Sequence, residues 1–279
     1  EESQPFLTDS PFGISLVHNG NLTNYDELKK EVEEKNLRHL NTNSDTELLI
    51  NVFADEIFKQ NVKHLKPKNI FDAIKKLFKR VKGSYSVIAF IANHGLIAFR
   101  DPFGIRPLCF GVRKDKLQDE YMFSSEDVAI NSLGFEKAGD LANGEIIYID
   151  QNHQVHRDIY KKEKHRPCIF EYVYLARPDS MIDDVSVYRS RIRMGDNLAK
   201  HLAKKDWQID VVIPVPDSAR TTALQIANRL NIPYREGIVK NRYIGRTFIM
   251  PGQATRKKSI KLKLNTIDLE IKGKNVLLV

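Results

Sequence analysis

The sequence predicts two domains of different fold class, an α+β domain at residues 1–150 and an α/β domain at residues 167–279. Three observations support this division. The first part mixes helical patterns with short strands and hairpins. The last part alternates apolar runs with helices, which is the order of a doubly wound parallel sheet. Between them lies a polar, charged stretch, Gln151 to Arg166, which we expect to be a linker.

The first predicted domain opens with a strand from Phe12 to Val17. We expect this strand to stop at His18-Asn19-Gly20-Asn21, because these residues are typical of a turn. A helix is expected from Ser44 to Phe58, since apolar residues recur there at helical spacing. Ser44 is a good N-cap, and Glu47 three residues later gives a capping-box pattern. A further helix is predicted at 69–81, and strands at 85–92, 96–99, 121–125 and 145–149.

The second predicted domain alternates strands and helices. Strands are expected at 168–175 and 211–215, helices at 187–203 and 218–230, and a last strand at 274–279. The last strand is a short apolar run of the kind buried in parallel sheets, where further chain must cover it. Because the sequence also starts at Glu1 without a methionine, we expect a fragment that lacks both termini.

Composition narrows the class of protein. The net charge is +8 and the pI about 9.3, but no recognition helix or stacking motif accompanies the basic residues, so nucleic acid is not an expected partner. Cys109 and Cys168 give no disulfide framework, which is typical of a reducing compartment. No apolar run has the length of a membrane span, and no signal peptide opens the chain. We therefore expect a cytoplasmic protein with no membrane partner.

The stretch from Lys240 to Gly252 carries the strongest functional signal. It interleaves cationic, aromatic and glycine residues with neither helical nor strand period, which is typical of a functional loop. Such a loop suits an anionic small molecule that must be covered and kept from water. Upstream, Val211 to Ser218 predicts a strand, a turn and a helix N-terminus, which together form a phosphate-receptive corner. Both features indicate phosphorylated-sugar chemistry.

Several motifs along the chain closely resemble those of the amidophosphoribosyltransferase (glutamine phosphoribosyl-diphosphate amidotransferase) family. They are His18-Asn19-Gly20-Asn21, Asn41 to Asp45, Phe99 to Pro102, Phe170 to Tyr174 with Arg177 to Ser180, and Lys240 to Gly252. The resemblance implies a four-layer αββα glutaminase domain of the N-terminal-nucleophile type (class II), followed by a type I phosphoribosyltransferase domain. It also implies the first step of de novo purine (IMP) synthesis, in which glutamine and 5-phosphoribosyl diphosphate give 5-phosphoribosylamine, glutamate and diphosphate.

The resemblance assigns roles to three residues of the first domain. The side-chain amide of Asn19 and the backbone N–H of Gly20 match the oxyanion hole of the family. Asp45 matches the carboxylate that binds the α-amino group of glutamine. Without the resemblance, Asn19 and Gly20 are read as an ordinary hairpin turn. Asp45 alone is read as an acidic residue in the first turn of a helix, and this role is compatible with ligand binding.

In the second domain, Ser218 matches a residue at the magnesium–substrate centre of the family; its alternative role is a plain helix N-cap. The loop that closes over 5-phosphoribosyl diphosphate is matched by Lys240, Arg242, Tyr243, Arg246 and Thr247. The wall of the ammonia channel is matched by Tyr172, Tyr243 and Ile249. For Tyr172 the alternative is a core tyrosine in a sheet. The resemblance further implies purine nucleotides as feedback inhibitors and a homo-oligomer.

The sequence also departs from the family. The family nucleophile is an N-terminal cysteine whose own α-amino group is the base, and Cys109 and Cys168 cannot replace it. The sequence also stops at Val279, before the acidic pair and the hydroxyl-rich loop with which the family holds the ribose, magnesium and the 5-phosphate. For both reasons, the sequence as given is expected to catalyse neither half-reaction. One alternative is a catalytically dead homologue with a regulatory or nucleotide-binding role. Another is a phosphoribosyltransferase joined to an unrelated domain, but the Asn19, Gly20 and Asp45 set argues against this, because a salvage enzyme needs no ammonia source.

The sequence does not favour either of two candidate metal sites. Cys168 matches one ligand of the 4Fe-4S cluster in an iron–sulfur branch of the family, but members without the cluster also carry a cysteine there. His153 and His156 are three residues apart without an accompanying cysteine or carboxylate cluster. Magnesium is the one cofactor that we expect.

Overall fold

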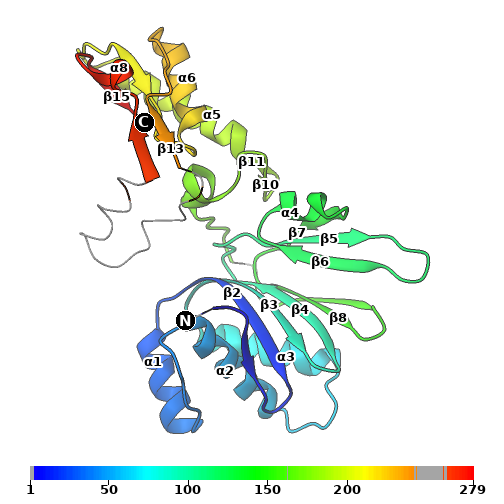
Figure 1. Ribbon diagram of the computed structural model, residues 1–279. Helices are drawn as coiled ribbons and strands as arrows, with labels where there is room; N and C mark the ends of the chain where they lie inside the picture. The colour runs from blue at the N-terminus through cyan, green and yellow to red at the C-terminus, as the bar shows by residue number, and fades with distance from the viewer. Residues whose placement is uncertain (1–2, 162, 242, 244–259, 261–262) are drawn as a thin grey trace. The chain divides into compact units, whose positions relative to one another are not determined.

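The computed structural model describes residues 3–161, 163–241, 243, 260 and 263–279. It divides the chain into two compact units, Glu1–Cys168 and Ile169–Val279 (Figure 1). Among the described residues no helix is both long and apolar enough to span a bilayer.

Two antiparallel sheets form the first unit. The larger has the strand order β1-β2-β3-β4-β8-β9 and the smaller β6-β5-β7. The larger sheet consists of β1 (Phe6–Thr8), β2 (Ile14–Leu22), β3 (Gly83–Ile91), β4 (Gly95–Arg100), β8 (Glu145–Asp150) and β9 (Val155–Ile159). The smaller consists of β5 (Cys109–Arg113), β6 (Glu120–Ser124) and β7 (Glu136–Asp140).

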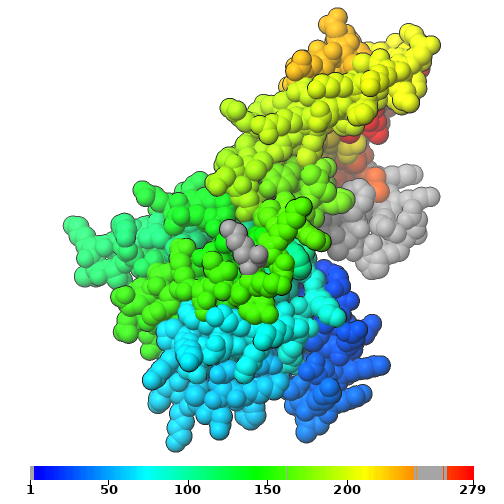
Figure 2. All heavy atoms as spheres, turned by 180° about the vertical axis from the view of Figure 1, so that it is seen from behind, coloured from blue at the N-terminus to red at the C-terminus, as the bar shows by residue number. Residues whose placement is uncertain are grey.

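Helices cover the outer side of each sheet, which gives the four αββα layers expected from the resemblance. The helices of the larger sheet are α1 (Tyr25–Lys30), the π-helix η1 (Glu31–Lys35), α2 (Asp45–Phe58) and α3 (Pro67–Arg80). On the smaller sheet, α4 (Asp127–Ser132) places Ile130 against Gly111. In the view from behind, light-blue to cyan atoms, the colours of α2 and α3, lie together on the surface of the first unit (Figure 2).

The alternation of side chains along β4 explains why the unit has two cores. Phe99 packs with Phe53 of α2 and Phe78 of α3 in the core between the helices and the larger sheet. Its neighbour Ala98 points to the opposite face and packs with Phe110 in the core between the two sheets. Successive residues of one strand thus belong to different cores.

Two predictions about the extent of strands and linker in this unit are wrong. The residues His18 to Asn21, expected in a turn, lie within β2, which pairs with β3 from Ile14↔Ile91 to Leu22↔Gly83. Pairing along the full strand overrides the local turn preference of Asn-Gly. The expected linker 151–166 contains strand β9, which pairs with β8. Its charged residues are those of a sheet edge, where such side chains are common, and this explains why composition suggested a linker.

The second unit contains the predicted parallel strand pair. Here β12 (Val211–Ile213) pairs in parallel with β15 (Val276–Leu278), and the helices α5 (Val187–Leu202) and α6 (Arg220–Leu230) pack on each other. Short antiparallel pairs accompany them, β10 (Met181–Ile182) with β11 (Val185–Ser186) and β13 (Ile238–Lys240) with β14 (Leu264–Thr266), and α8 (Asp268–Ile271) follows.

The strand predicted at 168–175 is instead the π-helix η2 (Glu171–Leu175). Its aromatic and β-branched residues favour a strand locally. In the folded unit, however, the buried Arg191 of α5 donates hydrogen bonds to the carbonyl oxygens of Tyr172 and Ala176, each at 2.8 Å. These bonds hold the segment in its helical path.

Candidate functional site

The first candidate site lies at the end of β2, where Gly20 passes close to the backbone of β3. Gly20 of β2 is opposite Tyr85 of β3. A β-carbon built on Gly20 would lie 1.9 Å from the carbonyl oxygen of Ser84 and 2.7 Å from Nε2 of His18. Such distances are far below van der Waals contact, so glycine alone fits this position. The alternative interpretation of Asn19 and Gly20 as a hairpin turn is therefore wrong.

The side-chain amide of Asn19 has a defined orientation. Its Oδ1 accepts a hydrogen bond from Nη2 of Arg106 at 2.8 Å, and its Nδ2 lies 3.4 Å from Oγ of Ser125. Asn19 and Ser125 also line a small cavity of about 130 Å³, together with His18 and Ser86. The amide nitrogen of Asn19 is thus placed at a hollow between the two sheets.

Asp45 lies beside the same stretch of β2 although it is 23 residues away from Leu22 in sequence. Its Oδ2 accepts a hydrogen bond from the backbone N–H of Leu22 at 3.2 Å, and its Oδ1 is 3.5 Å from Nδ1 of His18. Burial is the strongest influence on the pKa of Asp45 and raises it, but the hydrogen bonds from His18 and from backbone N–H groups outweigh burial and leave the pKa below its ordinary value. The carboxylate is therefore charged at neutral pH, and its side chain is 26% exposed.

Glu47 stabilises the loop that leads to Asp45. Its Oε2 accepts hydrogen bonds from the backbone N–H and the hydroxyl of Thr42, at 2.7 and 2.6 Å, and its Oε1 from the backbone N–H of Asn41 at 2.8 Å. The predicted capping box between Glu47 and Ser44 is absent, because Glu47 binds the preceding loop. Ser44 does cap α2, since its side chain accepts a hydrogen bond from the N–H of Thr46.

The two cysteines lie in different surroundings. Cys109 is buried in β5 and its Sγ donates to the carbonyl oxygen of Ser124; burial, more than any other influence, raises the pKa of this thiol to about 12. Cys168 is partly exposed, and its backbone N–H binds the carbonyl oxygen of Ile105. Nδ1 of His153 contacts the carbonyl oxygen of Asp119, and Nε2 of His156 contacts Asp150.

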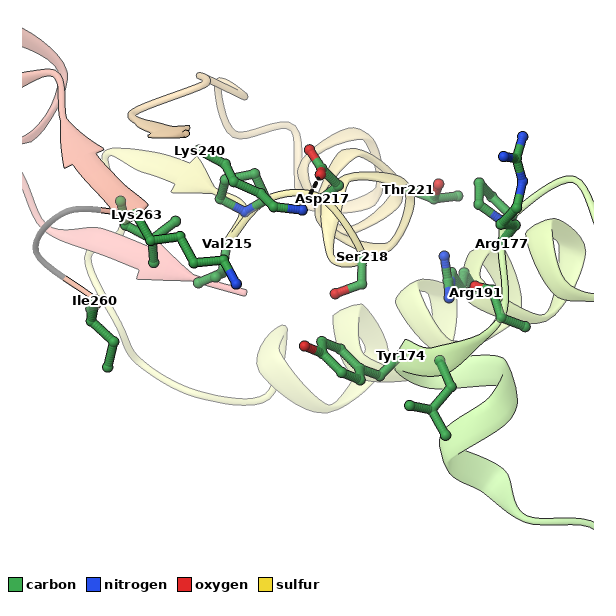
Figure 3. A pocket seen from close by; sticks show the side chains of 15 residues that line it. Tyr174, Arg177, Arg191, Val215, Asp217, Ser218, Thr221, Lys240, Ile260 and Lys263 are labelled. Atoms are coloured by element: carbon green, nitrogen blue, oxygen red, sulfur yellow. Dashed lines mark hydrogen bonds and ion pairs between the residues drawn. The ribbon is translucent and has the colours of Figure 1, made fainter. Parts of the chain in front are cut away.

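The second candidate site is a pocket of about 420 Å³ in the second unit. It lies between η2, the turn after β12 and the ends of β13 and β14. The side chains of Tyr174, Ser218 and Lys263 converge on it (Figure 3). Nζ of Lys240 forms an ion pair with Oδ2 of Asp217 at 2.7 Å on its wall. The pocket therefore combines ammonium groups and hydroxyls in the way an anionic ligand requires.

Of the site residues predicted in this unit, some line the pocket, one is buried and one is exposed. Ser218 lines the pocket but does not cap α6, whose N-cap is Ala219. Tyr172 is buried, with its hydroxyl 3.3 Å from the carbonyl oxygen of Ile182, whereas Tyr174 faces the pocket. The side chain of Tyr243 is fully exposed at 99%. The predicted residues Arg242, Arg246, Thr247 and Ile249 lie outside the described residues.

Sequence reasoning missed Arg106, Tyr174 and Arg191. Arg106 contacts Asn19 across 87 residues, a separation that leaves no periodic or local signal. Tyr174 belongs to the Tyr-rich motif that indicates the family, but the sequence places it in the strand predicted at 168–175 and gives it no role of its own. Arg191 lies on a helix among other charged residues, and only its burial distinguishes it.

Comparison with known proteins first gives a match within the first unit. Residues 1–132 match the family model described as a glutamine amidotransferase domain. This agrees with the four-layer arrangement of the first unit.

Relatives that match the whole chain indicate a more specific family than the domain match does. The amidophosphoribosyltransferase of Pseudomonas aeruginosa is 54% identical and that of Escherichia coli 51%, each with 100% of this chain and 56% of the relative covered. The solved glutamine phosphoribosylpyrophosphate amidotransferase of Bacillus subtilis, complexed with ADP and GMP, is 32% identical with a TM-score of 0.76; the match covers 99% of this chain and 57% of that one. The resemblance to amidophosphoribosyltransferases is thus confirmed, and the chain spans about half the length of these relatives.

Proposed function

We propose that the complete protein is an amidophosphoribosyltransferase, which uses glutamine to convert 5-phosphoribosyl diphosphate into 5-phosphoribosylamine in purine synthesis. The observation that carries this proposal is the placement of Asp45 against β2 beside Asn19 and Gly20. A charged carboxylate, and an amide nitrogen that faces a small cavity, match the two ends of a glutamine substrate. The similarity of the whole chain to enzymes of this name supports it.

In the glutamine half-reaction, Asp45 would bind the α-ammonium group of the substrate. A nucleophile attacks the side-chain amide carbon, and the carbonyl oxygen becomes an oxyanion. Nδ2 of Asn19 and the N–H of Gly20 would donate hydrogen bonds to that oxyanion. Ammonia leaves, and hydrolysis of the acyl intermediate gives glutamate. Cys109 does not serve as the nucleophile, because burial holds its thiol protonated at neutral pH.

For the second half-reaction we propose that the pocket around Ser218 binds 5-phosphoribosyl diphosphate in a phosphoribosyltransferase domain. Ammonia attacks the anomeric carbon; a C–N bond forms, the C–O bond to diphosphate breaks, and diphosphate leaves. Lys240 and Lys263 would bind its negative charge. The Ser218 hydroxyl and the Asp217 carboxylate are oxygen donors that suit magnesium, which usually takes one or two protein oxygens and completes its shell with phosphates and water. Magnesium would neutralise charge on the leaving group.

We further propose that purine nucleotides bind the complete protein as feedback inhibitors, that it forms a homo-oligomer, and that it works in the cytoplasm. The complex of the Bacillus subtilis relative with ADP and GMP supports nucleotide binding. The absence of a membrane-spanning helix among the described residues is compatible with the proposed location.

The test is a product balance. The complete protein is incubated with glutamine, 5-phosphoribosyl diphosphate and magnesium, and glutamate and diphosphate are measured over time. We expect the two products in equal amounts. Release of neither product would contradict the proposal and favour a regulatory homologue. Glutamate without diphosphate would contradict the proposed second half-reaction alone.

A further inference from the structure

We propose that Arg106 is a positioning residue of the glutamine site, which holds the amide of Asn19 in the one orientation that can stabilise an oxyanion. This inference rests on the proposed function and adds to it a residue outside the oxyanion hole itself. It is carried by the hydrogen bond from Nη2 of Arg106 to Oδ1 of Asn19, at 2.8 Å.

The two ends of an asparagine amide are nearly equal in size but opposite in hydrogen bonding. Only Nδ2 donates, so only this atom can stabilise an oxyanion, and a 180° flip of the amide would present Oδ1 instead. A guanidinium carries donors and no acceptor. Arg106 can therefore bind Oδ1 of Asn19 and cannot accept from Nδ2. In the flipped state two donors would face each other at Arg106, and two negative oxygens would face each other at the substrate.

The free end of the amide is placed as this role requires. With Oδ1 bound to Arg106, Nδ2 of Asn19 lies on the other side, 3.4 Å from the hydroxyl of Ser125. This contact is long for a hydrogen bond, so a charged oxygen can replace it at little cost. Both Asn19 and Ser125 line the cavity between the sheets.

Hydrogen bonds from two other side chains fix the main chain of Arg106. Its carbonyl oxygen accepts hydrogen bonds from Nε of Arg100 at 2.7 Å and from the hydroxyl of Ser86 at 3.0 Å. Arg100 is only 1% exposed, and it also donates to the carbonyl oxygens of Gly104 and Leu141. These hydrogen bonds join the loop that carries Arg106 to β3 and β4. A side chain on such a rigidly held loop can orient another residue.

The buried carboxylate of Asp101 stabilises the same loop by hydrogen bonds to its backbone. Asp101 is fully buried and accepts hydrogen bonds from the backbone N–H groups of Phe103 and Ile105, at 2.9 and 3.0 Å. The sequence Arg100-Asp101, noted above as a family motif, therefore shapes the loop without touching Asn19. We infer that Arg100 and Asp101 fix the conformation of the loop, and that this conformation places Arg106 against Asn19 of β2.

The experiment is a double-mutant cycle in the complete protein, with Arg106→Met, Asn19→Ala and the double variant. For Arg106→Met we expect kcat for glutamine hydrolysis to fall at least roughly 10-fold, because losing one oxyanion donor costs on the order of 100- to 1000-fold and a free amide still samples the correct orientation. The KM for glutamine should change less than about 2-fold, since Asp45 is untouched. Ammonia-dependent synthesis should persist, which also shows that the variant is folded.

The decisive result is the effect of Arg106→Met in the Asn19→Ala background. If Arg106 acts through Asn19, the second change should add less than about a 2-fold loss. An equal loss in both backgrounds would overturn the inference, since Arg106 would then act independently of Asn19. If Asn19→Ala itself left glutamine hydrolysis intact, the proposed oxyanion hole would fail instead.

Two further variants complete the design. Arg113→Met is the matched control, because Arg113 of β5 is at the exposed end of its strand and pairs with Glu120; wild-type kinetics are expected. Should Arg106→Met abolish ammonia-dependent synthesis as well, the same cycle is run with Arg106→Lys, which keeps the charge with a different donor geometry. A partial loss of kcat that disappears in the Asn19→Ala background supports the inference, and a loss that remains there refutes it.

Discussion

Gly20 lies so close to Ser84 that a β-carbon on Gly20 would stand 1.9 Å from the Ser84 carbonyl oxygen. The two residues belong to neighbouring strands, β2 and β3, whose pairing continues from Ile14 to Leu22. Two residues further along β2, the backbone N–H of Leu22 donates to Oδ2 of Asp45 in the first turn of α2. The same stretch of β2 therefore carries Gly20 and contacts the carboxylate of Asp45.

Replacing Gly20 by alanine should therefore damage both stability and glutamine use. We expect Gly20→Ala to lose about 2–3 kcal/mol in the free energy of unfolding, because overpacking against a backbone atom forces the strands apart. Glutamine-dependent activity should fall strongly as Asn19 moves. Urea denaturation and glutamate release measure the two effects.

The control for this prediction is Gly13→Ala, whose β-carbon would meet Ala92 Cβ at an ordinary 3.4 Å. It should leave both the free energy of unfolding and glutamate release near wild type. A Gly20→Ala protein with wild-type stability would contradict the close contact.

The hydrogen bonds of Glu47 to the loop before Asp45 should make the free energy of unfolding depend on pH in the acid range. Burial raises its pKa most, but hydrogen bonds from Thr42 and Asn41 outweigh burial and leave the pKa of Glu47 below its ordinary value. The ionised form is thus favoured in the folded state. The stability that it contributes is complete above the ordinary glutamate pKa, about 4.3, and is lost as the pH falls through the lower, folded-state pKa.

We accordingly expect Glu47→Gln to lose about 2 kcal/mol of unfolding free energy at pH 7. The difference from wild type should shrink as the pH falls from about 5 to 3. Chemical denaturation at several pH values measures this. Glu34→Gln, on the exposed side of η1, is the control and should run parallel to wild type. A constant difference at all pH values would contradict the assignment.

Arg191 should control the pocket of the second unit through η2. Without its guanidinium, the carbonyl oxygens of Tyr172 and Ala176 lose their donors. We expect Arg191→Met to lose about 2–4 kcal/mol of unfolding free energy and to raise the KM for 5-phosphoribosyl diphosphate, because Tyr174 would no longer be held at the pocket. Arg193→Met, exposed on the same helix, should change neither. Equal effects of the two variants would argue against a specific role of Arg191.

Lys240 should matter for synthesis from either nitrogen source. Its ammonium group lies on the wall of the pocket beside Asp217. Lys240→Ala should weaken diphosphate binding roughly 10-fold, the value of one hydrogen bond between charged groups, and should slow synthesis with glutamine and with ammonia alike. Calorimetry with inorganic diphosphate measures the binding. Lys272→Ala, on an exposed lysine paired with Asp268, is the control; if it had the same effect, general charge and not the pocket would be responsible.

The spacing of apolar residues predicts those helices whose structure depends mainly on their own residues. The helix expected at Ser44 to Phe58 is observed as Asp45–Phe58, and the one expected at 69–81 as Pro67–Arg80. In both, apolar residues at helical spacing face one core. The strand β2 was predicted only as far as Val17, because its last residues are held by pairing with β3, a segment more than 60 residues away. Long-range pairing of this kind has no local signature.

The same distinction applies to the candidate site. Asn19, Gly20 and Asp45 could be named from the sequence because they lie in short motifs that indicate a family. Arg106 could not, since its importance arises only when the loop after β4 folds back on β2. The error at 168–175 has a similar cause, because Arg191 supplies from another helix the hydrogen bonds that hold η2.

Asp45 is proposed to bind glutamine in a site that supplies ammonia to a separate synthesis. The most direct test is Asp45→Asn in the complete protein, with steady-state kinetics for glutamine and for ammonia. We expect a KM for glutamine raised at least roughly 10-fold, because the substrate ammonium loses a charged partner, while ammonia-dependent synthesis is unchanged. An unchanged KM for glutamine, or loss of both activities together, would contradict it.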